Sequence, residues 1–252
     1  MTASVVTAAI LVIGDEILSG RTQDTNTQTL ARFLGVRGID VAEVRVVPDE
    51  TDRIVEALDA LRSRWTYVFT TGGIGPTHDD ITADAVAQAF GVALPEHPEA
   101  LRLLEGRYPE GELNAARRRM ARVPEGGTLI ANPVSIAPGF QMENVFVMAG
   151  VPSIMTGMLE DVGPRLQGGT PVVSRTLRVS GVGEGTIAEP LARTAREHRA
   201  LSLGSYPFFD AERRAYGSNL VIRGRNEAEV EAAAGALLAA LGEAGVTKVS
   251  PA

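Results

Sequence analysis

A glycine-rich segment, residues 72–82, contains two adjacent carboxylates, Asp79 and Asp80. Three glycines near its start allow the backbone to turn sharply and to approach a ligand closely. The amides freed by such a turn, with those of the following helix, form an anion-binding concavity. Carboxylates beside a phosphate would repel it unless a divalent cation lay between them. The segment therefore predicts a metal-assisted phosphate or pyrophosphate site.

Two other loops carry acids that could complete this site. Glu16 follows the apolar run 8–13, and Asp49 follows the predicted strand 41–47. Each acid taken alone is equally consistent with a helix cap or a helix-dipole partner. In open parallel sheets, however, ligands bind at the carboxyl ends of the strands, where these loops would meet. Convergence of both acids with Asp79 and Asp80 predicts a divalent cation, Mg²⁺, Mn²⁺ or Co²⁺.

Strand and helix patterns alternate around these loops. Residues 14–26 are expected to form a polar loop. Strands are expected at 8–13, 41–47 and 67–71, and helices near 30–38, 54–64 and 83–90. This alternation predicts an α/β fold with a largely parallel sheet and helices on both faces.

The next part of the chain departs from that alternation. The charged segment 96–122 has a mostly helical pattern and is predicted to be a helical insertion or lid over the carboxyl edge of the sheet. Short strands at 128–130, 139–142 and 145–149 predict a small antiparallel addition. A helix is expected from Pro152 onward.

Residues 168–171, with two glycines and a proline, form the best boundary in the chain. We expect one domain at residues 1–168 and a second at 171–252. The second has the order strand, helix, strand, strand, helix, with a hairpin near 210–214. It is predicted to be a small βαββα unit of the α+β class.

A proline-containing loop, Asn132–Phe140, adds further polar groups. Asn132 and Ser135 could hydrogen-bond a base, a pterin or a ribose, because two prolines would hold them rigidly. An ordinary proline-shaped loop explains the same residues equally well. Spacing leaves both interpretations open.

Composition restricts the function. A net charge of −7 disfavours nucleic acids and anionic membranes as partners. The absence of cysteine excludes disulfides, thiolate nucleophiles and Cys-ligated metals. No apolar stretch is long enough to span a bilayer, and the first apolar run lacks the basic start of a signal peptide. We expect a cytoplasmic protein.

Several motifs occur in the order of a known family. They are Gly14–Gly20, Asp24–Thr27, Gly72–Thr82, Asn132–Phe140 and Ala149–Ser153. Together they resemble the molybdopterin-binding (MoaB/MogA-like) domain, in the form found at the N-terminus of CinA-type competence/damage-inducible proteins. Residues 181–190 and 203–207 resemble the KH-like middle domain of the same proteins. Their third, nicotinamide-nucleotide deamidase domain has no counterpart here, so that activity is not expected.

The resemblance implies a three-layer α/β/α fold, a small nucleotide or pterin ligand, and assembly as a dimer or trimer. By motif position, catalytic roles fall on Glu16, Asp49 and Asp80, and metal ligands on these three and Asp79. The residues expected to bind substrate are Gly14, Asn26, Gly72, Gly73, Ile74, Gly75, Pro76, Thr77, Asn132, Ser135, Pro138 and Gly139.

The same resemblance leaves two kinds of enzyme and one binding protein open. CinA-type domains are similar to metal-dependent ADP-ribose pyrophosphatases, which implies hydrolysis of a phosphoanhydride. Molybdopterin adenylyl transfer is the alternative, but Ile74 stands where adenylyltransferases usually carry Thr, and Asp79 also departs from their pattern. These departures favour the hydrolase. A non-catalytic molybdopterin- or nucleotide-binding module remains the third hypothesis.

Overall fold

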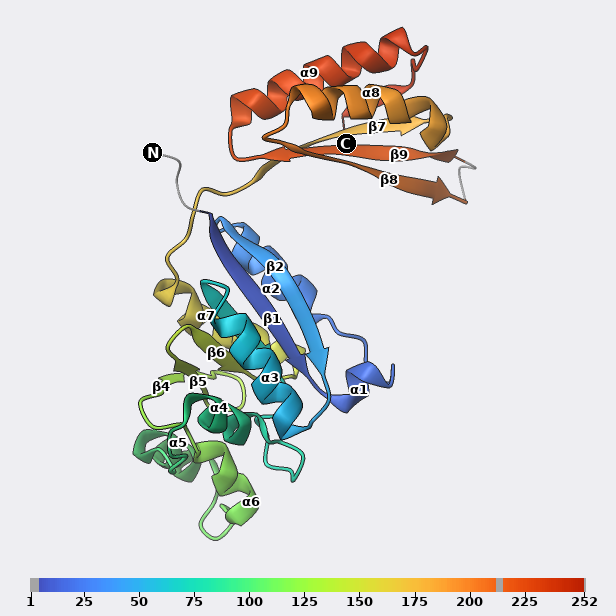
Figure 1. Cartoon of the computed structure of the whole chain (residues 1–252). Helices are drawn as coiled ribbons and strands as arrows, with labels where there is room; N and C mark the ends of the chain where they lie inside the picture. Colours follow the sequence, from blue (N-terminus) through green and yellow to red (C-terminus); the bar gives the residue numbers. More distant parts are fainter. Residues whose placement is uncertain (1–4, 212–214, 252) are drawn as a thin grey trace. The chain divides into compact units, whose positions relative to one another are not determined.

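A six-stranded sheet forms the centre of the first unit, with the strand order β2-β1-β3-β6-β5-β4 (Figure 1). The structure is a computed structural model, and it describes residues 5–211 and 215–251. The parallel strands are β1 (Val6–Ile13), β2 (Ile39–Val47), β3 (Tyr67–Thr71) and β6 (Val145–Met148). The antiparallel strands are β4 (Thr128–Ile130) and β5 (Gly139–Met142). The predicted parallel sheet and its antiparallel addition are confirmed.

Helices cover both faces of this sheet (Figure 1). On one face lie α2 (Asn26–Gly35) and α7 (Pro152–Val162), and on the other lie α3 (Thr51–Arg62) and α4 (Thr82–Phe90). Each helix buries one apolar stripe; in α3 this stripe contains Ile54, Leu58 and Leu61. Because the sheet separates two apolar cores, the predicted three-layer α/β/α fold is confirmed.

The charged segment after α4 is helical, as predicted. It contains α5 (Pro98–Arg107), α6 (Ala115–Arg118) and the 3₁₀ helix η1 (Arg119–Ala121). Ala100, Leu104 and Ala121 form a small core of their own. This core fixes η1, and with it Arg119, against α5.

The second unit is built on a separate sheet. Contacts divide the chain into residues 1–169 and 170–252. The second unit contains β7 (Val173–Ser180), α8 (Glu184–Glu197), β8 (Ser202–Asp210), β9 (Ala215–Gly224), α9 (Glu227–Glu243) and β10 (Val249–Pro251). Its antiparallel strands have the order β10-β7-β9-β8, and both helices pack on one core. The predicted hairpin near 210–214 lies partly outside the described residues.

Two short elements were not predicted. The loop after β1 contains the one-turn helix α1 (Asp15–Leu18), and β10 pairs with β7 after α9. Both are shorter than the window in which hydrophobic periodicity can be recognised. A 3₁₀ helix, η2 (Gly163–Arg165), extends α7 by a turn. Among the helices of the described ranges, none is long and apolar enough to cross a membrane.

Candidate functional site

The glycine loop leaves β3 with a backbone that only glycine accommodates. Gly72 has φ +109°, and a Cβ at this position would lie 2.1 Å from the carbonyl oxygen of Ile13. Its N–H donates to the Met148 carbonyl oxygen at 3.2 Å. The hydroxyl of the buried Thr82 donates to the Gly72 carbonyl at 2.9 Å, and its N–H donates to the Gly73 carbonyl at 3.0 Å. These bonds fix the start of the loop between β1 and β6.

Three consecutive amides follow this anchor. Among the described residues, no acceptor receives a hydrogen bond from the N–H of Gly73, Ile74 or Gly75. These residues are half-buried, so their amides are partly shielded from solvent. Free amides in a tight glycine turn are suited to an anion such as phosphate. Pro76 and Thr77 follow at the exposed tip of the loop.

The acids of the first two loops meet beside Asp49. The Asp15 N–H donates to Asp49 Oδ2 at 2.9 Å, and the Gly14 N–H donates to the Val47 carbonyl at 3.1 Å. The Glu16 carboxylate folds back over Gly14, where a Cβ would lie 2.5 Å from Glu16 Oε2. Parallel pairing of β1 with β2 thus brings the two loops to one edge of the sheet, as the sequence predicted.

Burial and the neighbouring acids together affect the pKa of the Asp49 carboxyl. Burial raises the pKa of the Asp49 carboxyl, and the neighbouring charges of Asp15, Glu16 and Asp79 raise it further, against the lowering effect of the Asp15 N–H. Like charges around a half-buried carboxylate disfavour its ionised form. A cation bound here would relieve that repulsion.

Asp80 has a different environment. Its Oδ2 accepts hydrogen bonds from the N–H of Thr77, at 2.8 Å, and from the Thr77 hydroxyl. A Cβ at Gly75 would lie 2.6 Å from Asp80 Oδ2, so the missing side chain of Gly75 makes room for this carboxylate. The Thr77 hydroxyl also contacts Asp79, and this hydrogen bond lowers the pKa of the Asp79 carboxyl. Asp80 holds the tip of the loop, whereas Asp79 lies in the electrostatic field of Asp49.

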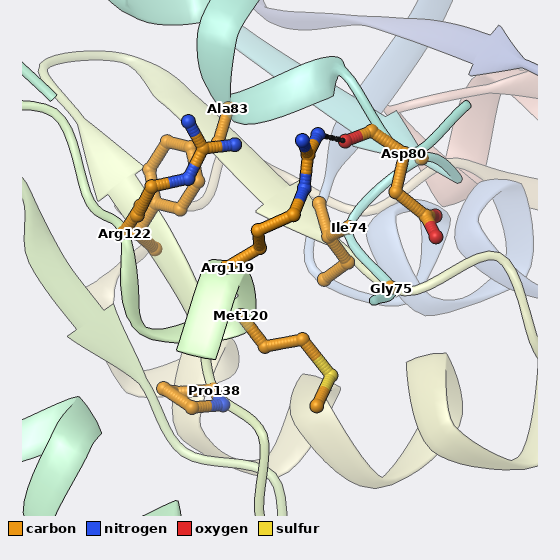
Figure 2. Close-up of a pocket in the computed structure, with 10 residues that line it drawn as sticks. Ile74, Gly75, Asp80, Ala83, Arg119, Met120, Arg122 and Pro138 are labelled. Atoms are coloured by element: carbon orange, nitrogen blue, oxygen red, sulfur yellow. Dashed lines mark hydrogen bonds between the residues drawn. The ribbon is translucent and has the colours of Figure 1, made fainter. Parts of the chain in front are cut away.

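A small pocket opens on the α4 side of the loop (Figure 2). It is lined by Gly73, Ile74, Gly75, Asp80, Ala83, Arg119, Met120, Arg122, Pro138 and Phe140. Figure 2 shows the Arg119 guanidinium extending toward Asp80, and Arg119 Nη2 donates to the Asp80 carbonyl oxygen at 3.1 Å. A positive charge therefore lies beside the free amides, which strengthens the suitability of this pocket for an anion.

Arg122 has a structural partner. Its Nη1 and Nη2 donate to the two carboxylate oxygens of Asp84 at 2.8 and 2.7 Å. Arg119 Nη2 lies 3.8 Å from the same carboxylate. This two-pronged ion pair ties the end of η1 to the first turn of α4.

The proline-containing loop is organised by Asn132. The Asn132 Nδ2 donates to Ser135 Oγ at 2.6 Å and to the Ala137 carbonyl at 2.7 Å, while its Oδ1 accepts from the amides of Val134 and Ser135. An amide side chain has two donors and two acceptor positions, and all are used here within its own loop. Pro138 lines the pocket that contains Arg119 and Arg122 (the arginine pocket). Gly139 begins β5 at a point where a Cβ would lie 2.3 Å from the Val147 carbonyl.

Asn26 connects the start of α2 to the end of β6. It is 6% exposed, and its Nδ2 donates to the Gly150 carbonyl oxygen at 2.7 Å. Asp24 receives the Asn26 and Thr27 amides and so caps the helix. Asn26 thus lies at the same edge of the sheet as the glycine loop, on the α2 side.

The predicted residues therefore form two groups around one loop. Gly14, Glu16 and Asp49 gather at the ends of β1 and β2, while Asp80 and Pro138 border the pocket on the other side. In the sequence, the arginine cluster 117–122 is most typical of a solvated helix face and could also guide a phosphate ligand, so the separate contacts of Arg119 and Arg122 were not predicted. Its placement depends on η1, which a three-residue segment does not reveal in sequence.

The acids beside Asp49 fit a divalent cation only together with further ligands. Within residues 5–211 and 215–251, no three His, Asp or Glu side chains are close enough together to hold a metal ion alone. The donors present beside Asp49 are carboxylate oxygens, the type that Mg²⁺ and Mn²⁺ prefer, and burial, with the charges of neighbouring acids, raises the pKa of Asp49. Mg²⁺ is commonly bound by one or two carboxylates together with substrate phosphates. Glu16 and Asp49 fit that form of binding.

Two family models together match most of the chain. Residues 9–168 match the model described as a probable molybdopterin binding domain. Residues 171–250 match the model described as the middle domain of FAD synthase. The two matches meet between α7 and β7, where the contacts divide the chain.

Two similar proteins show the extent of the sequence match. A CinA-like protein of Citrifermentans bemidjiense is 43% identical over 193 residues, which cover 73% of this chain and 46% of that protein. The chain thus spans about half the length of such CinA-like relatives. A protein of Pyrobaculum aerophilum is 38% identical over 210 residues, which cover 79% of each chain.

A solved structure agrees with the fold of the first unit. The crystal structure of the protein CinA with unknown function from Thermoplasma acidophilum is 32% identical, with a TM-score of 0.61. The match covers 64% of this chain and 99% of that one.

Proposed function

The chain belongs to the family of probable molybdopterin binding domains, in its CinA-like form, and on that premise we propose that it is a metal-dependent hydrolase of nucleotide phosphoanhydrides, with ADP-ribose as the model substrate. Hydrolysis would join a water oxygen to one phosphorus and break its bond to the bridging oxygen. The products would be AMP and ribose 5-phosphate.

One observation carries this proposal. The clustered acids around Asp49 lie at the same sheet edge as three amides, those of Gly73, Ile74 and Gly75, that have no acceptor among the described residues. Amides alone would suit a simple anion-binding site, and acids alone would suit a capping role. Their combination supports a site in which phosphate and cation bind together.

The residues have separate roles in this proposal. The three amides, with Arg119 behind the loop, would bind phosphate oxygens and stabilise negative charge that grows during the reaction. Glu16 and Asp49 would hold the cation, which when bound polarises the phosphate and lowers the pKa of a water molecule. Asp80 would act indirectly, because it keeps Thr77 and the loop tip in place.

Incubation of the purified protein with ADP-ribose and Mg²⁺, Mn²⁺ or Co²⁺ tests the proposal. We expect metal-dependent release of AMP, measured by chromatography. Asp49→Asn keeps an acceptor for the Asp15 N–H but removes a charge, so it should lower kcat by about 100-fold or more. Asp52→Asn, a change of the same kind at an exposed acid of α3, is the matched control and should retain wild-type rates.

Other results would identify another function. Formation of an adenylylated pterin from ATP and molybdopterin, without AMP release from ADP-ribose, would replace hydrolysis by adenylyl transfer. Tight binding of nucleotide or molybdopterin in calorimetry, with no product under any of the three metals, would identify a binding module. Equal AMP release by wild type and Asp49→Asn would refute the assigned role of the acids.

A further inference from the structure

A second cavity lies at the carboxyl ends of β1 and β3, on the α2 side of the sheet. Its volume is about 50 Å³. It is lined by Val12, Ile13, Glu16, Ile17, Thr22, Gln23, Asp24, Thr25, Asn26, Thr71, Gly150 and Pro152. All of these residues belong to the described part of the chain, and none is basic. The cavity therefore carries two acids and no basic residue, in contrast to the arginine pocket on the other side of the glycine loop.

Two residues that line this cavity each carry a buried oxygen atom without a partner among the described residues. Thr71 is 1% exposed and Asn26 is 6% exposed, and neither Thr71 Oγ1 nor Asn26 Oδ1 has a hydrogen-bond partner within the described residues. A buried polar atom without a partner is costly, so such atoms usually mark a place where a ligand or water completes the bonding. Both atoms belong to residues that line the same small space.

The strand geometry and one hydrogen bond orient these groups. Thr71 lies two residues after Phe69, which belongs to the core between the sheet and α2, so its side chain is on that same face. The Asn26 Nδ2 is committed to the Gly150 carbonyl at 2.7 Å. This bond fixes the amide so that Oδ1 remains as an acceptor. A ligand that satisfies these two oxygens must therefore supply hydrogen-bond donors.

The size and the charge of the cavity restrict the kind of ligand that it can bind. A phosphate is disfavoured because the lining has two acids, Glu16 and Asp24, and no basic residue among those described. A volume of about 50 Å³ accepts a few water-sized groups. The hydroxyl groups of a sugar edge are neutral donors of suitable size.

We propose that this cavity binds the hydroxyl groups of a sugar that is attached to the substrate phosphates, with Thr71 and Asn26 as the residues that select it. The inference rests on the proposed phosphoanhydride hydrolysis and specifies a ribosyl phosphate as the substrate class. Thr71 directly precedes Gly72, and Glu16 borders both the cavity and the acid cluster. A sugar here would be bonded to a phosphate at the glycine loop.

The Thr71→Val variant tests this assignment. Valine keeps the shape of threonine and removes the hydroxyl, which makes no bond to the described protein, so the melting temperature should not fall. We expect the KM for ADP-ribose to rise at least tenfold. In titration calorimetry, the affinity for ribose 5-phosphate should fall at least fivefold, whereas that for methyl phosphate should not change.

Thr70→Val is the matched control. Thr70 is 0% exposed and its hydroxyl also has no partner among the described residues, but it lies on the opposite face of β3 and does not line the cavity. It should keep wild-type KM and wild-type affinity for ribose 5-phosphate. Equal effects of the two variants would overturn the inference.

The two proposals can fail separately. If wild type prefers ribose 5-phosphate through Thr71 but hydrolyses nothing, the hydrolase proposal fails and the sugar site stands. If wild type hydrolyses ADP-ribose but Thr71→Val leaves KM unchanged or weakens ribose 5-phosphate and methyl phosphate equally, the sugar site fails. A rise in wild-type melting temperature with K⁺ or NH₄⁺ that Thr71→Val abolishes would assign the cavity to a cation and overturn the inference.

Discussion

Replacement of Gly72 by alanine should be among the most damaging single changes in the first unit. The added Cβ would lie 2.1 Å from the Ile13 carbonyl oxygen, which belongs to the backbone of β1 and cannot rotate away. A residue with a Cβ at positive φ costs about 1–2 kcal/mol. A forced shift of packed backbone adds about 1–3 kcal/mol. Together these terms predict a loss of about 2–5 kcal/mol in the free energy of unfolding.

Urea unfolding followed by tryptophan fluorescence measures this loss, because Trp65, the only tryptophan, lies in the first unit. With a slope of about 2 kcal/mol per M, the midpoint should fall by about 1–2.5 M. Gly20→Ala is the control: Gly20 also has positive φ, +72°, but a Cβ added there would have no atom within 4 Å. It should lose only the backbone term of about 1–2 kcal/mol. Equal losses in the two variants would refute the close approach of the loop to β1.

Three further outcomes are expected. Because the pKa of Asp49 is raised in the folded protein, its ionisation reduces stability as pH rises from the ordinary pKa through the raised one. Without metal, the free energy of unfolding of Asp49→Asn should therefore increase relative to that of wild type between pH 4 and pH 7, by less than about 1 kcal/mol after solvent screening. A stability advantage of Asp49→Asn at pH 4 alone would contradict this. Arg122→Lys should lower the urea-measured free energy of unfolding by about 1 kcal/mol, because lysine cannot form the two-pronged bond to Asp84; wild-type stability would contradict this. Gly75→Ala should displace the Asp80 carboxylate. The free energy of unfolding should change by less than about 1 kcal/mol, whereas the rate of ADP-ribose hydrolysis should fall at least tenfold. An unchanged rate would refute the role of the loop tip.

The sequence predicted the sheet well because long apolar runs and their alternation with helical spacing depend only on local pattern. It also placed Glu16 and Asp49 at one edge, since parallel strands bring their carboxyl ends together. It assigned the catalytic role to Asp80 and not to Asp79, and it did not reveal that Asp80 bonds to Thr77 while Asp79 acts on Asp49. Which carboxylate faces the acids depends on the turn at Thr77, and hydrogen bonds of that turn are not encoded in spacing.

Other features could not be predicted for a different reason. The missing partner of Thr71 Oγ1 is a property of its surroundings, contributed by α2 and the residues after β6. Asn132 looked equally suited to a ligand and to its own loop, and only the positions of its four partners distinguish these uses. Short elements such as α1 lack enough residues to show a period.

The pairing of β3 with β6 has a consequence for how the protein folds. These strands are neighbours in the sheet, yet residues 72–144 lie between them in the chain. Closing so long a segment is entropically costly, and non-local pairings of this kind slow folding. Since the Gly72 amide bonds to Met148, we expect the glycine loop to gain its final shape late, which pulsed hydrogen exchange at that amide would detect. A nascent chain would then acquire its binding site only after β6 had emerged from the ribosome.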